Sequence, residues 1–299
     1  MFKIRSLKIE CSGGLGNQLF LWNLAHILAE KYNCKVEIFY NKIPDNNQNR
    51  LIEIIELSDH CSHNITVKGR VIIPFILKLH DKTSNLQCFK INFIPKILKL
   101  TEINDPWGSP NFSKNPSRIY RGFYQNMELF RDAFPLVKDE ILALIGTKFH
   151  QISSNLGFDL SVTKYQALHI RRGDYVENKE TIGVLSLDFY KKSLNYDLQT
   201  IISCDDDSYL YEIKDYFPKV KVIDPKIFDT WQSFSILALS QRIIIANSTF
   251  SWWAAQFVLN RNGQVIAPIP WYKNLSAPYN YLENNKFTYI ESEFIETLS

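Results

Sequence analysis

The fold is decided by residues 243–255, which read IIIANSTFSWWAA. Apolar residues typical of a buried strand are followed by small polar residues and then by the apolar start of a helix. This order of strand, turn and helix repeats through the second half of the chain. It predicts strands at 166–170, 200–204, 220–223, 243–246 and 265–267, and helices near 187–198, 208–217, 230–240 and 251–260. Such connections form right-handed βαβ units, so we expect a doubly wound parallel sheet that binds ligands at the carboxyl ends of its strands.

The first half of the chain begins in the same way. A strand, a helix, a second strand and a later helix are predicted at 2–11, 18–32, 36–40 and 132–145. Residues 151–158 are polar and typical of a turn, so the domain boundary is placed there. We therefore expect an α/β protein with two domains, 1–155 and 156–299, of which the second binds the principal ligand.

Composition excludes several classes of protein. The 299 residues are 45% hydrophobic and 22% charged, which indicates a globular chain and excludes a disordered protein or a coiled coil. A formal net charge of +3 is too small to favour nucleic acid as a partner. No apolar run approaches the ~20 residues that cross a bilayer, and the first residues alternate as in a strand rather than a secretion signal. We expect a cytoplasmic protein.

Two further features of the composition bear on partners and metals. The cysteines lack the CxxC spacing of zinc or dithiol sites, and we expect buried free thiols at Cys11, Cys34, Cys61, Cys88 and Cys204. Residues 61–100 carry seven Lys or Arg and one acid. This segment is interpreted either as a solvated basic face or as a surface that contacts the inner membrane or an anionic acceptor.

The motif HIRRGDY, residues 169–175, follows a predicted strand directly. Arginine carries a rigid fork of donors that can hold a phosphate with two hydrogen bonds, and Gly173 has no Cβ to keep a ligand away from the backbone. Asp174 is placed to brace one guanidinium. A plain Arg–Asp ion pair at a strand end is the competing interpretation of this motif.

The motif NSTFS, residues 247–251, lies between an apolar strand and an apolar helix. Hydroxyl groups and unpaired backbone N–H groups at a helix N-terminus favour an anion, and phosphate is the expected one. The alternative is that a Ser or Thr only caps the helix while Trp252 and Trp253 pack in the core.

The glycine turn GGLGNQ, residues 13–18, joins the first strand to its helix. It matches neither the GxGxxG fingerprint of dinucleotide-binding folds nor a P-loop. It is interpreted either as a tight structural turn or as a place where Gly14, Gly16 and Asn17 approach a ligand between the domains.

Three consecutive acids, Asp205 to Asp207, follow the predicted strand at 200–204. An Asp-x-Asp pattern can hold a divalent metal on a nucleotide diphosphate. Capping of the next helix is the favoured interpretation, because Arg171 and Arg172 are available to neutralise a diphosphate. We therefore expect no metal site and no cofactor.

Together, GGLGNQLF, HIRRGDY and NSTFSWWAAQ, in this order from Gly13 to Gln256, resemble glycosyltransferase family 11, whose best-known members are α-1,2-fucosyltransferases. The resemblance implies a B-type glycosyltransferase fold in which two Rossmann-like domains face a cleft. It also implies GDP-L-fucose as donor, inversion at the anomeric carbon and no metal. The acceptor it implies is a galactose or N-acetylgalactosamine unit of an oligosaccharide or lipid-linked glycan, as in O-antigen synthesis at the cytoplasmic face of the inner membrane.

The resemblance also implies roles for individual residues. Arg171 would contact the β-phosphate, while Arg172 and Asp174 orient the donor and Asn17 positions the reactants. The donor-binding residues carried over from the motifs are Gly14, Gly16, His169, Arg172, Ser248, Thr249, Phe250 and Ser251. The proton acceptor is left open between Asp174 and Glu177, the carboxylates nearest to the arginine motif.

One position departs from the family pattern. Ser235 stands where an acid is common, and if that acid holds guanine, Asp205, Asp206 or Asp229 would have to replace it. Of these three, Asp205 is counted among the expected donor-binding residues. Three rival interpretations also stay open: the same fold with another nucleotide sugar, a metal-dependent A-type transferase using the aspartates, and a noncatalytic sugar-binding protein.

Overall fold

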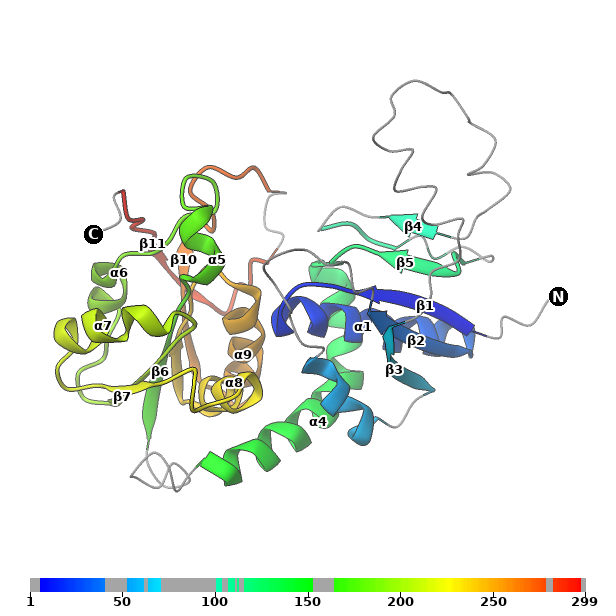
Figure 1. The fold of residues 1–299 in the computed structure, drawn as a ribbon, viewed down its shortest axis with the longest axis horizontal. Helices are drawn as coiled ribbons and strands as arrows, with labels where there is room; N and C mark the ends of the chain where they lie inside the picture. Colours follow the sequence, from blue (N-terminus) through cyan, green and yellow to red (C-terminus); the bar gives the residue numbers. More distant parts are fainter. Residues whose placement is uncertain are drawn as a thin grey trace. The chain divides into compact units, whose positions relative to one another are not determined.

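The computed structural model describes residues 6–40, 53–61, 64–70, 101–103, 107–110, 112, 116–152, 164–277 and 282–296. The chain divides into two compact units, Met1–Ile141 and Leu142–Ser299. Each unit is built around its own parallel sheet (Figure 1). Residues 153–163 around the expected boundary lie outside the described residues, so the domain limits 1–155 and 156–299 stay a prediction.

The first unit contains a five-stranded sheet in the order β3-β2-β1-β5-β4. Its strands are β1 (Ser6–Cys11), β2 (Lys35–Tyr40), β3 (Ile65–Arg70), β4 (Thr101–Ile103) and β5 (Ile119–Arg121). All of their pairings are parallel. The basic segment expected at 61–100 falls largely outside the described residues, but Lys68 within it pairs with Glu37 at 2.7 Å.

The helices of the first unit are longer than the sequence predicts. α1 (Leu15–Tyr32) starts before residue 18, because extended Gly14 accepts hydrogen bonds from the backbone N–H groups of Asn17 and Gln18. A 3₁₀ helix, η1 (Glu53–His60), follows β2 in the chain, and α4 (Met127–Ile152) runs across the limit between the two units. The prediction of 132–145 covers only the middle of α4.

The second unit contains a six-stranded sheet in the order β11-β10-β9-β6-β7-β8. Its strands are β6 (Tyr165–Ile170), β7 (Gln199–Cys204), β8 (Lys221–Ile223), β9 (Arg242–Ile244), β10 (Gln264–Ile269) and β11 (Thr288–Glu291). All described pairings are parallel, which confirms the sheet expected for this half of the chain. Strand β11, an edge strand with no buried residue, has no counterpart in the predicted strands.

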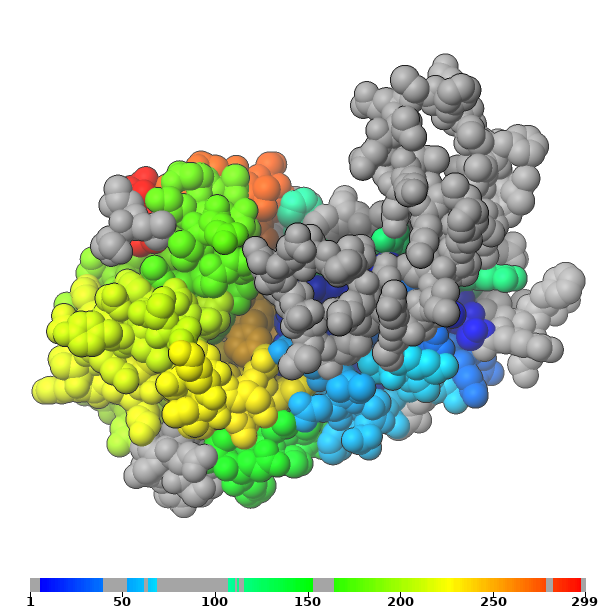
Figure 2. Space-filling model, viewed as in Figure 1, coloured from blue at the N-terminus to red at the C-terminus, as the bar shows by residue number. Residues whose placement is uncertain are grey.

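The helices of the second unit cover both faces of this sheet. They are α5 (Gly173–Glu177), α6 (Leu187–Lys192), α7 (Leu210–Tyr216), α8 (Thr230–Leu239) and α9 (Thr249–Asn260), and a 3₁₀ turn, η3 (Asp207–Tyr209), precedes α7. Figure 1 shows α6 and α7 on one side of the sheet and α8 and α9 on the other. Every residue of the central strand β6 is buried as a result. In the space-filling view, the yellow-green and yellow residues around α7 and α8 cover much of the visible face of this unit (Figure 2).

Within the described residues, no helix has the length and apolar character needed to cross a membrane.

Candidate active site

The sequence motifs of the second unit meet at one edge of its sheet. β6 lies between β9 and β7, and the chain continues from β6 toward β7 but from β9 toward β10. The strand order therefore reverses between β6 and β9, and parallel sheets bind ligands beyond the carboxyl ends of strands at such a point. The turns at 171–177, 205–208 and 245–251 all lie at this edge.

Arg171 is held by carboxylates from two turns. Its Nη2 pairs with Asp174, and its Nη1 lies 2.5 Å from Oδ2 of Asp205. Its guanidinium also lies 5.0 Å from the ring centre of Tyr175. Burial disfavours the charge, but Asp205 and Asp174 outweigh burial and raise the pKa of Arg171. The side chain is thus a fixed, permanently charged group, and its buried Nε has no hydrogen-bond partner among the described residues.

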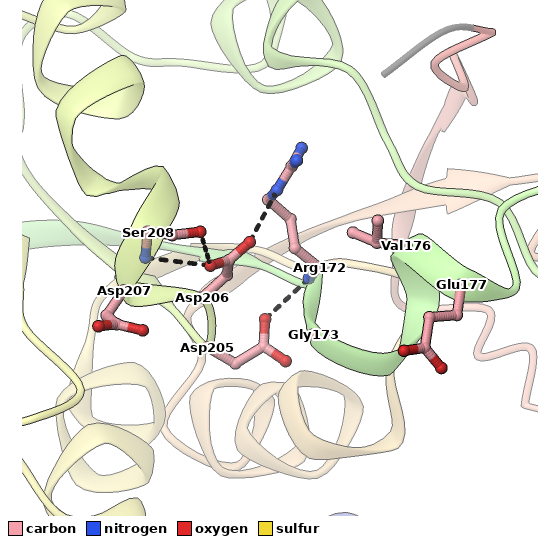
Figure 3. Close-up of a pocket in the computed structure, with 8 residues that line it drawn as sticks. All are labelled: Arg172, Gly173, Val176, Glu177, Asp205, Asp206, Asp207 and Ser208. Atoms are coloured by element: carbon pink, nitrogen blue, oxygen red, sulfur yellow. Dashed lines mark hydrogen bonds and ion pairs between the residues drawn. The ribbon is translucent and has the colours of Figure 1, made fainter. Parts of the chain in front are cut away.

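Arg172 presents a different set of contacts. Its backbone N–H donates to Asp205 at 2.8 Å, and its Nε donates to Asp206 at 3.3 Å. The guanidinium carbon lies 3.5 Å from the ring centre of Tyr209. Figure 3 shows the end of this side chain pointing away from the aspartates. Its two terminal nitrogens have no ion-pair or hydrogen-bond partner in the part of the chain that the structure describes, so they are available to an anion.

A surface hollow of about 470 Å³ lies between the turns that follow β6 and β7 (Figure 3). It is lined by Arg172, Gly173, Val176, Glu177, Asp205, Asp206, Asp207 and Ser208. Glu177 is exposed there, whereas the carboxylate of Asp174 is engaged by Arg171. A Cβ on Gly173 would lie 2.5 Å from Oδ2 of Asp205, so glycine is needed here for the approach of that carboxylate.

Each of the three consecutive aspartates has a protein partner. Asp205 contacts Arg171, and Asp206 accepts hydrogen bonds from Arg172 and from Ser208 at the start of η3. Asp207 pairs with Lys226. Among the described residues these aspartates do not form a group of three converging metal ligands. Asp206 is the N-cap residue of η3, as the capping interpretation of this motif predicts.

His169 lies inside the site rather than at its surface. Its side chain is buried, and its ring centre is 5.1 Å from that of Phe250. Burial, with a smaller contribution from the charge of Arg171, lowers the pKa of His169 to about 3. This imidazole is therefore neutral at ordinary pH.

The N-terminus of α9 faces the same sheet edge. Ser248 is the N-cap residue, but its side chain makes no capping hydrogen bond. The buried Ser251 hydroxyl instead donates to the carbonyls of Ala246 and Ser248. Asn247 donates to the carbonyls of Ile182 and Gly183, and so fixes the segment that leads into α6. A helix start of this kind, without a side-chain cap, fits an anion.

In the first unit, the glycine turn that precedes α1 is closely packed against its own Asn17. Gly13 has a φ of +75°, and a Cβ there would lie 2.4 Å from Nδ2 of Asn17. The Asn17 side chain accepts a hydrogen bond from Gln125 at 2.9 Å. Gly14 is the N-cap residue of α1, and Gly16 is buried in its first turn.

Comparison with known proteins then decides the family. The sequence model described as glycosyl transferase family 11 matches residues 6–288. The chain belongs to glycosyltransferase family 11. It is therefore a glycosyltransferase, as the motif order implies.

Two Escherichia coli relatives are each 26% identical to this family 11 chain. The O-antigen biosynthesis glycosyltransferase WbnK aligns over 284 residues, 87% of this chain and 93% of the relative. An alpha-1,2-colitosyltransferase aligns over 278 residues, 88% of this chain and 91% of the relative.

A solved structure bears on the fold. The glycosyl transferase family 9 structure from Veillonella parvula DSM 2008 aligns over 96% of this chain and 87% of that chain, with a TM-score of 0.52 and 10% identity. This likeness concerns the fold alone. With the two parallel sheets, it confirms a B-type glycosyltransferase fold built from Rossmann-like units. The cleft expected between the units stays a prediction.

Ser235, the position that departs from the family pattern in this family 11 chain, lies within a helix. Ser235 is buried in α8, and its hydroxyl donates to the carbonyl of Trp231. Asp229 caps the same helix and pairs with Lys148 at 3.0 Å. Asp205 and Asp206 line the hollow, and which acid replaces the one missing at position 235 stays a prediction.

Sequence reasoning missed some residues that shape the site. Tyr209 supports the Arg172 guanidinium, and Tyr175 donates from its hydroxyl to the carbonyl of Asn247. Strands β6 and β7 end in register, with Ile170 opposite Cys204. Alignment of their two apolar runs in the sequence could therefore have placed the turns that follow them side by side. No comparable signal in the sequence points to the ring of Tyr209.

Proposed function

We propose that this family 11 enzyme is an inverting α-1,2-fucosyltransferase with GDP-fucose as donor. The observation that carries the proposal is the cationic pair Arg171 and Arg172 at the strand-order reversal, beside the uncapped start of α9. A nucleotide diphosphate presents two adjacent phosphates, and fixed guanidinium groups together with a helix N-terminus are suited to bind them.

In the proposed reaction, the bond between the fucose anomeric carbon and the β-phosphate oxygen breaks, and the electron pair leaves with GDP. The acceptor 2-hydroxyl oxygen bonds to the anomeric carbon from the opposite face and gives its proton to a carboxylate. Negative charge grows on the β-phosphate as the bond breaks. A guanidinium fixed before the reaction stabilises that charge at no cost of reorganisation.

The two arginines are assigned different parts in this step. Arg171 is fixed by Asp174 and Asp205, so its Nε keeps one orientation as charge develops on the phosphate. Arg172 supplies terminal nitrogens that hold the donor in both ground and transition states. With these cations at the site, the proposed reaction needs no metal ion.

The remaining site residues are given supporting roles. Glu177 is preferred as proton acceptor because it is exposed in the hollow, whereas Asp174 is paired with Arg171. Phe250, backed by the buried and uncharged ring of His169, is proposed to form an apolar wall for the nucleoside, and Ser248, Thr249 and Ser251 lie at the helix start proposed for the diphosphate. Asn17, with Gly14 and Gly16, is proposed to position the reactants.

The names of the relatives support the proposed class of acceptor. An O-antigen biosynthesis enzyme and an α-1,2-linking transferase are both similar over most of the chain. We propose a galactose or N-acetylgalactosamine acceptor in a lipid-linked surface glycan, which the enzyme meets in the cytoplasm at the inner membrane.

Colitosyl transfer is the second candidate, because one relative is an alpha-1,2-colitosyltransferase. Colitose is fucose without its 3-hydroxyl group. A site that hydrogen-bonds this hydroxyl discriminates strongly against the deoxy sugar, whereas a site built for colitose rejects fucose only weakly.

The deciding experiment measures GDP release from GDP-fucose and, separately, GDP-colitose, with a panel of β-galactosides and N-acetylgalactosaminides. Each reaction is run with and without EDTA. Acceptor-dependent release from GDP-fucose that persists in EDTA supports the proposal, and NMR of the product then shows the linkage.

Other outcomes would overturn it. Release from GDP-colitose alone would assign colitosyl transfer. Release that EDTA abolishes and Mn²⁺ restores, in a chain still folded in EDTA, would revive the aspartate metal site. Sugar binding without release from either donor would indicate a noncatalytic protein.

A further inference from the structure

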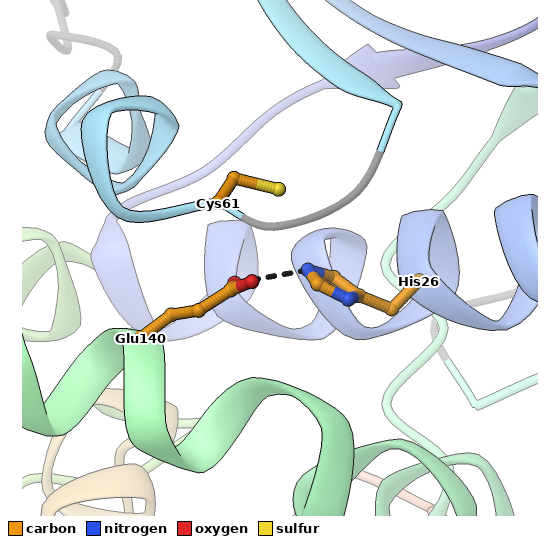
Figure 4. A group of neighbouring side chains, drawn as sticks. All are labelled: His26, Cys61 and Glu140. Carbon is orange, nitrogen blue, oxygen red and sulfur yellow. Dashed lines mark ion pairs between the residues drawn. The ribbon is translucent and has the colours of Figure 1, made fainter.

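Three metal-ligating side chains meet inside the first unit, apart from the residues assigned to catalysis. They are His26 on α1, Cys61 directly after η1, and Glu140 on α4 (Figure 4). One ligand atom from each lies within 4.8 Å of the other two. His26 and Glu140 are buried, and Cys61 is half-buried, so the group has one side that solvent can reach.

The distances suit a small divalent ion. Nε2 of His26 and Oε2 of Glu140 are 3.1 Å apart. Ligands bound to zinc at about 2.0–2.3 Å in a tetrahedral arrangement lie roughly 3.3–3.6 Å from one another. The His–Glu distance is close to that spacing, and the Cys61 sulfur lies within 4.8 Å of both ligand atoms. Imidazole, thiolate and carboxylate are the three side-chain ligands that zinc uses.

The surroundings hold the ligands in place. The indole N–H of Trp22 donates to the same Glu140 oxygen at 3.2 Å, and the Trp22 ring packs at 5.3 Å from that of His26. Hydrogen bonds to metal ligands from a second layer of residues orient them and raise metal affinity.

The three ligands come from three different elements of the first unit, α1, η1 and α4. The start of η1 is fixed by Gln18, whose side-chain oxygen accepts hydrogen bonds from the N–H groups of Glu53 and Ile54. Cys61 follows the last residue of η1. An ion bound by Cys61 would fix the other end of η1 against α1 and α4. It would thereby stabilise α1, the helix that follows the glycine turn.

We propose that His26, Cys61 and Glu140 bind one structural divalent transition-metal ion, zinc by its ligand preference, with water as the fourth ligand. On binding, the thiol of Cys61 gives its proton to solvent and the thiolate bonds to the ion. This proposal differs from the expectation from the sequence, which was that the chain has no metal site. The proposed metal site does not depend on the proposed function, because metal binding is measured directly and not through transferase activity.

The test uses the untagged full chain, freed of metal by a chelator and titrated with Co²⁺. We expect a near-ultraviolet thiolate-to-cobalt charge-transfer band that saturates at one ion per chain and disappears when Zn²⁺ displaces cobalt. Cys61→Ser should abolish the band and weaken zinc binding by about a hundredfold. Cys34→Ser, which removes a buried free thiol elsewhere in the unit, should leave both unchanged.

The wild-type titration decides the matter even if a variant fails to fold. Absence of a saturable charge-transfer band in the wild-type chain overturns the proposal. A band that survives in Cys61→Ser and vanishes in Cys34→Ser overturns the assignment of ligands. His26→Gln and Glu140→Gln, each checked for folding by circular dichroism, should keep the thiolate band only at much higher cobalt concentration.

Discussion

Arg171 shows how a single residue can be fixed for one task. Asp174 and Asp205 hold its guanidinium from two turns, and its contact with a departing phosphate is proposed to strengthen as charge develops. We expect Arg171→Ala to lower kcat for GDP release by about a hundredfold or more, with a smaller change in KM. Arg171→Lys should recover little, because one ammonium cannot replace a planar fork that contacts two carboxylates.

The control for this measurement is Arg131→Ala, which removes an exposed arginine of α4. Circular dichroism and thermal unfolding of each variant show whether the loss is catalytic. Turnover of Arg171→Ala close to that of the wild type would refute the assigned role.

Arg172 should respond differently to the same substitution. Its terminal nitrogens are proposed to hold the donor throughout the reaction, so Arg172→Ala should raise KM for the nucleotide sugar about tenfold and change kcat less. Steady-state kinetics with varied donor measures both constants. A lower kcat for Arg172→Ala, together with a higher KM for the donor in Arg171→Ala, would mean that the two roles are exchanged.

The buried imidazole of His169 makes stability depend on pH. Its pKa is about 3 in the folded chain and near 6.5 when unfolded, so protonation favours the unfolded chain as pH falls from 6.5 toward 3. This group should remove about 2 kcal/mol of the free energy of unfolding between pH 7 and pH 5. Urea unfolding of wild type and His169→Gln at both pH values measures it, and equal pH dependence in the two would contradict the prediction.

At the scale of elements, Gln18 links α1 to η1. Its buried side chain accepts from the N–H groups of Glu53 and Ile54 and donates to the carbonyl of Gly13. Gln18→Ala leaves these groups without their partner, so we expect a loss of about 1–3 kcal/mol in the free energy of unfolding. Urea unfolding measures the loss, with Gln151→Ala at an exposed position of α4 as control. Equal stability of the two variants would mean that water replaces the hydrogen bonds of the Gln18 side chain.

The elements also show which features a sequence can predict. The strands β6, β7 and β9 were predictable because apolar runs ending in polar turns are local signals, and these turns carry the candidate site. The end of α6 at Lys192 was not, because Asn195 turns away to donate its N–H to Gln166 of β6, a contact between distant residues. Cys61 was expected to be buried like Cys11 and is only half-buried, and Cys88 lies outside the described residues.

In the whole molecule, the two units are proposed to differ in their need for metal: the reaction in the second unit needs none, whereas the stability of the first unit depends on a bound ion. The proposed reaction uses guanidinium groups of the second unit, whereas the proposed zinc ion ties α1, η1 and α4 in the first. Chelation should therefore leave the initial rate unchanged at a temperature far below unfolding. It should lower the unfolding temperature, because an ion that binds only the folded chain stabilises it.

This expectation separates two explanations of any loss of activity in EDTA. Initial rates and circular dichroism are recorded together at low temperature and near the unfolding transition, with EDTA and after addition of Zn²⁺ or Mn²⁺. If the zinc ion is structural, activity and folded signal fall together only near the transition, and zinc restores both. A rate that falls at low temperature while the chain stays folded, and that returns with Mn²⁺, would instead place the metal at the aspartates after β7 and refute the guanidinium mechanism.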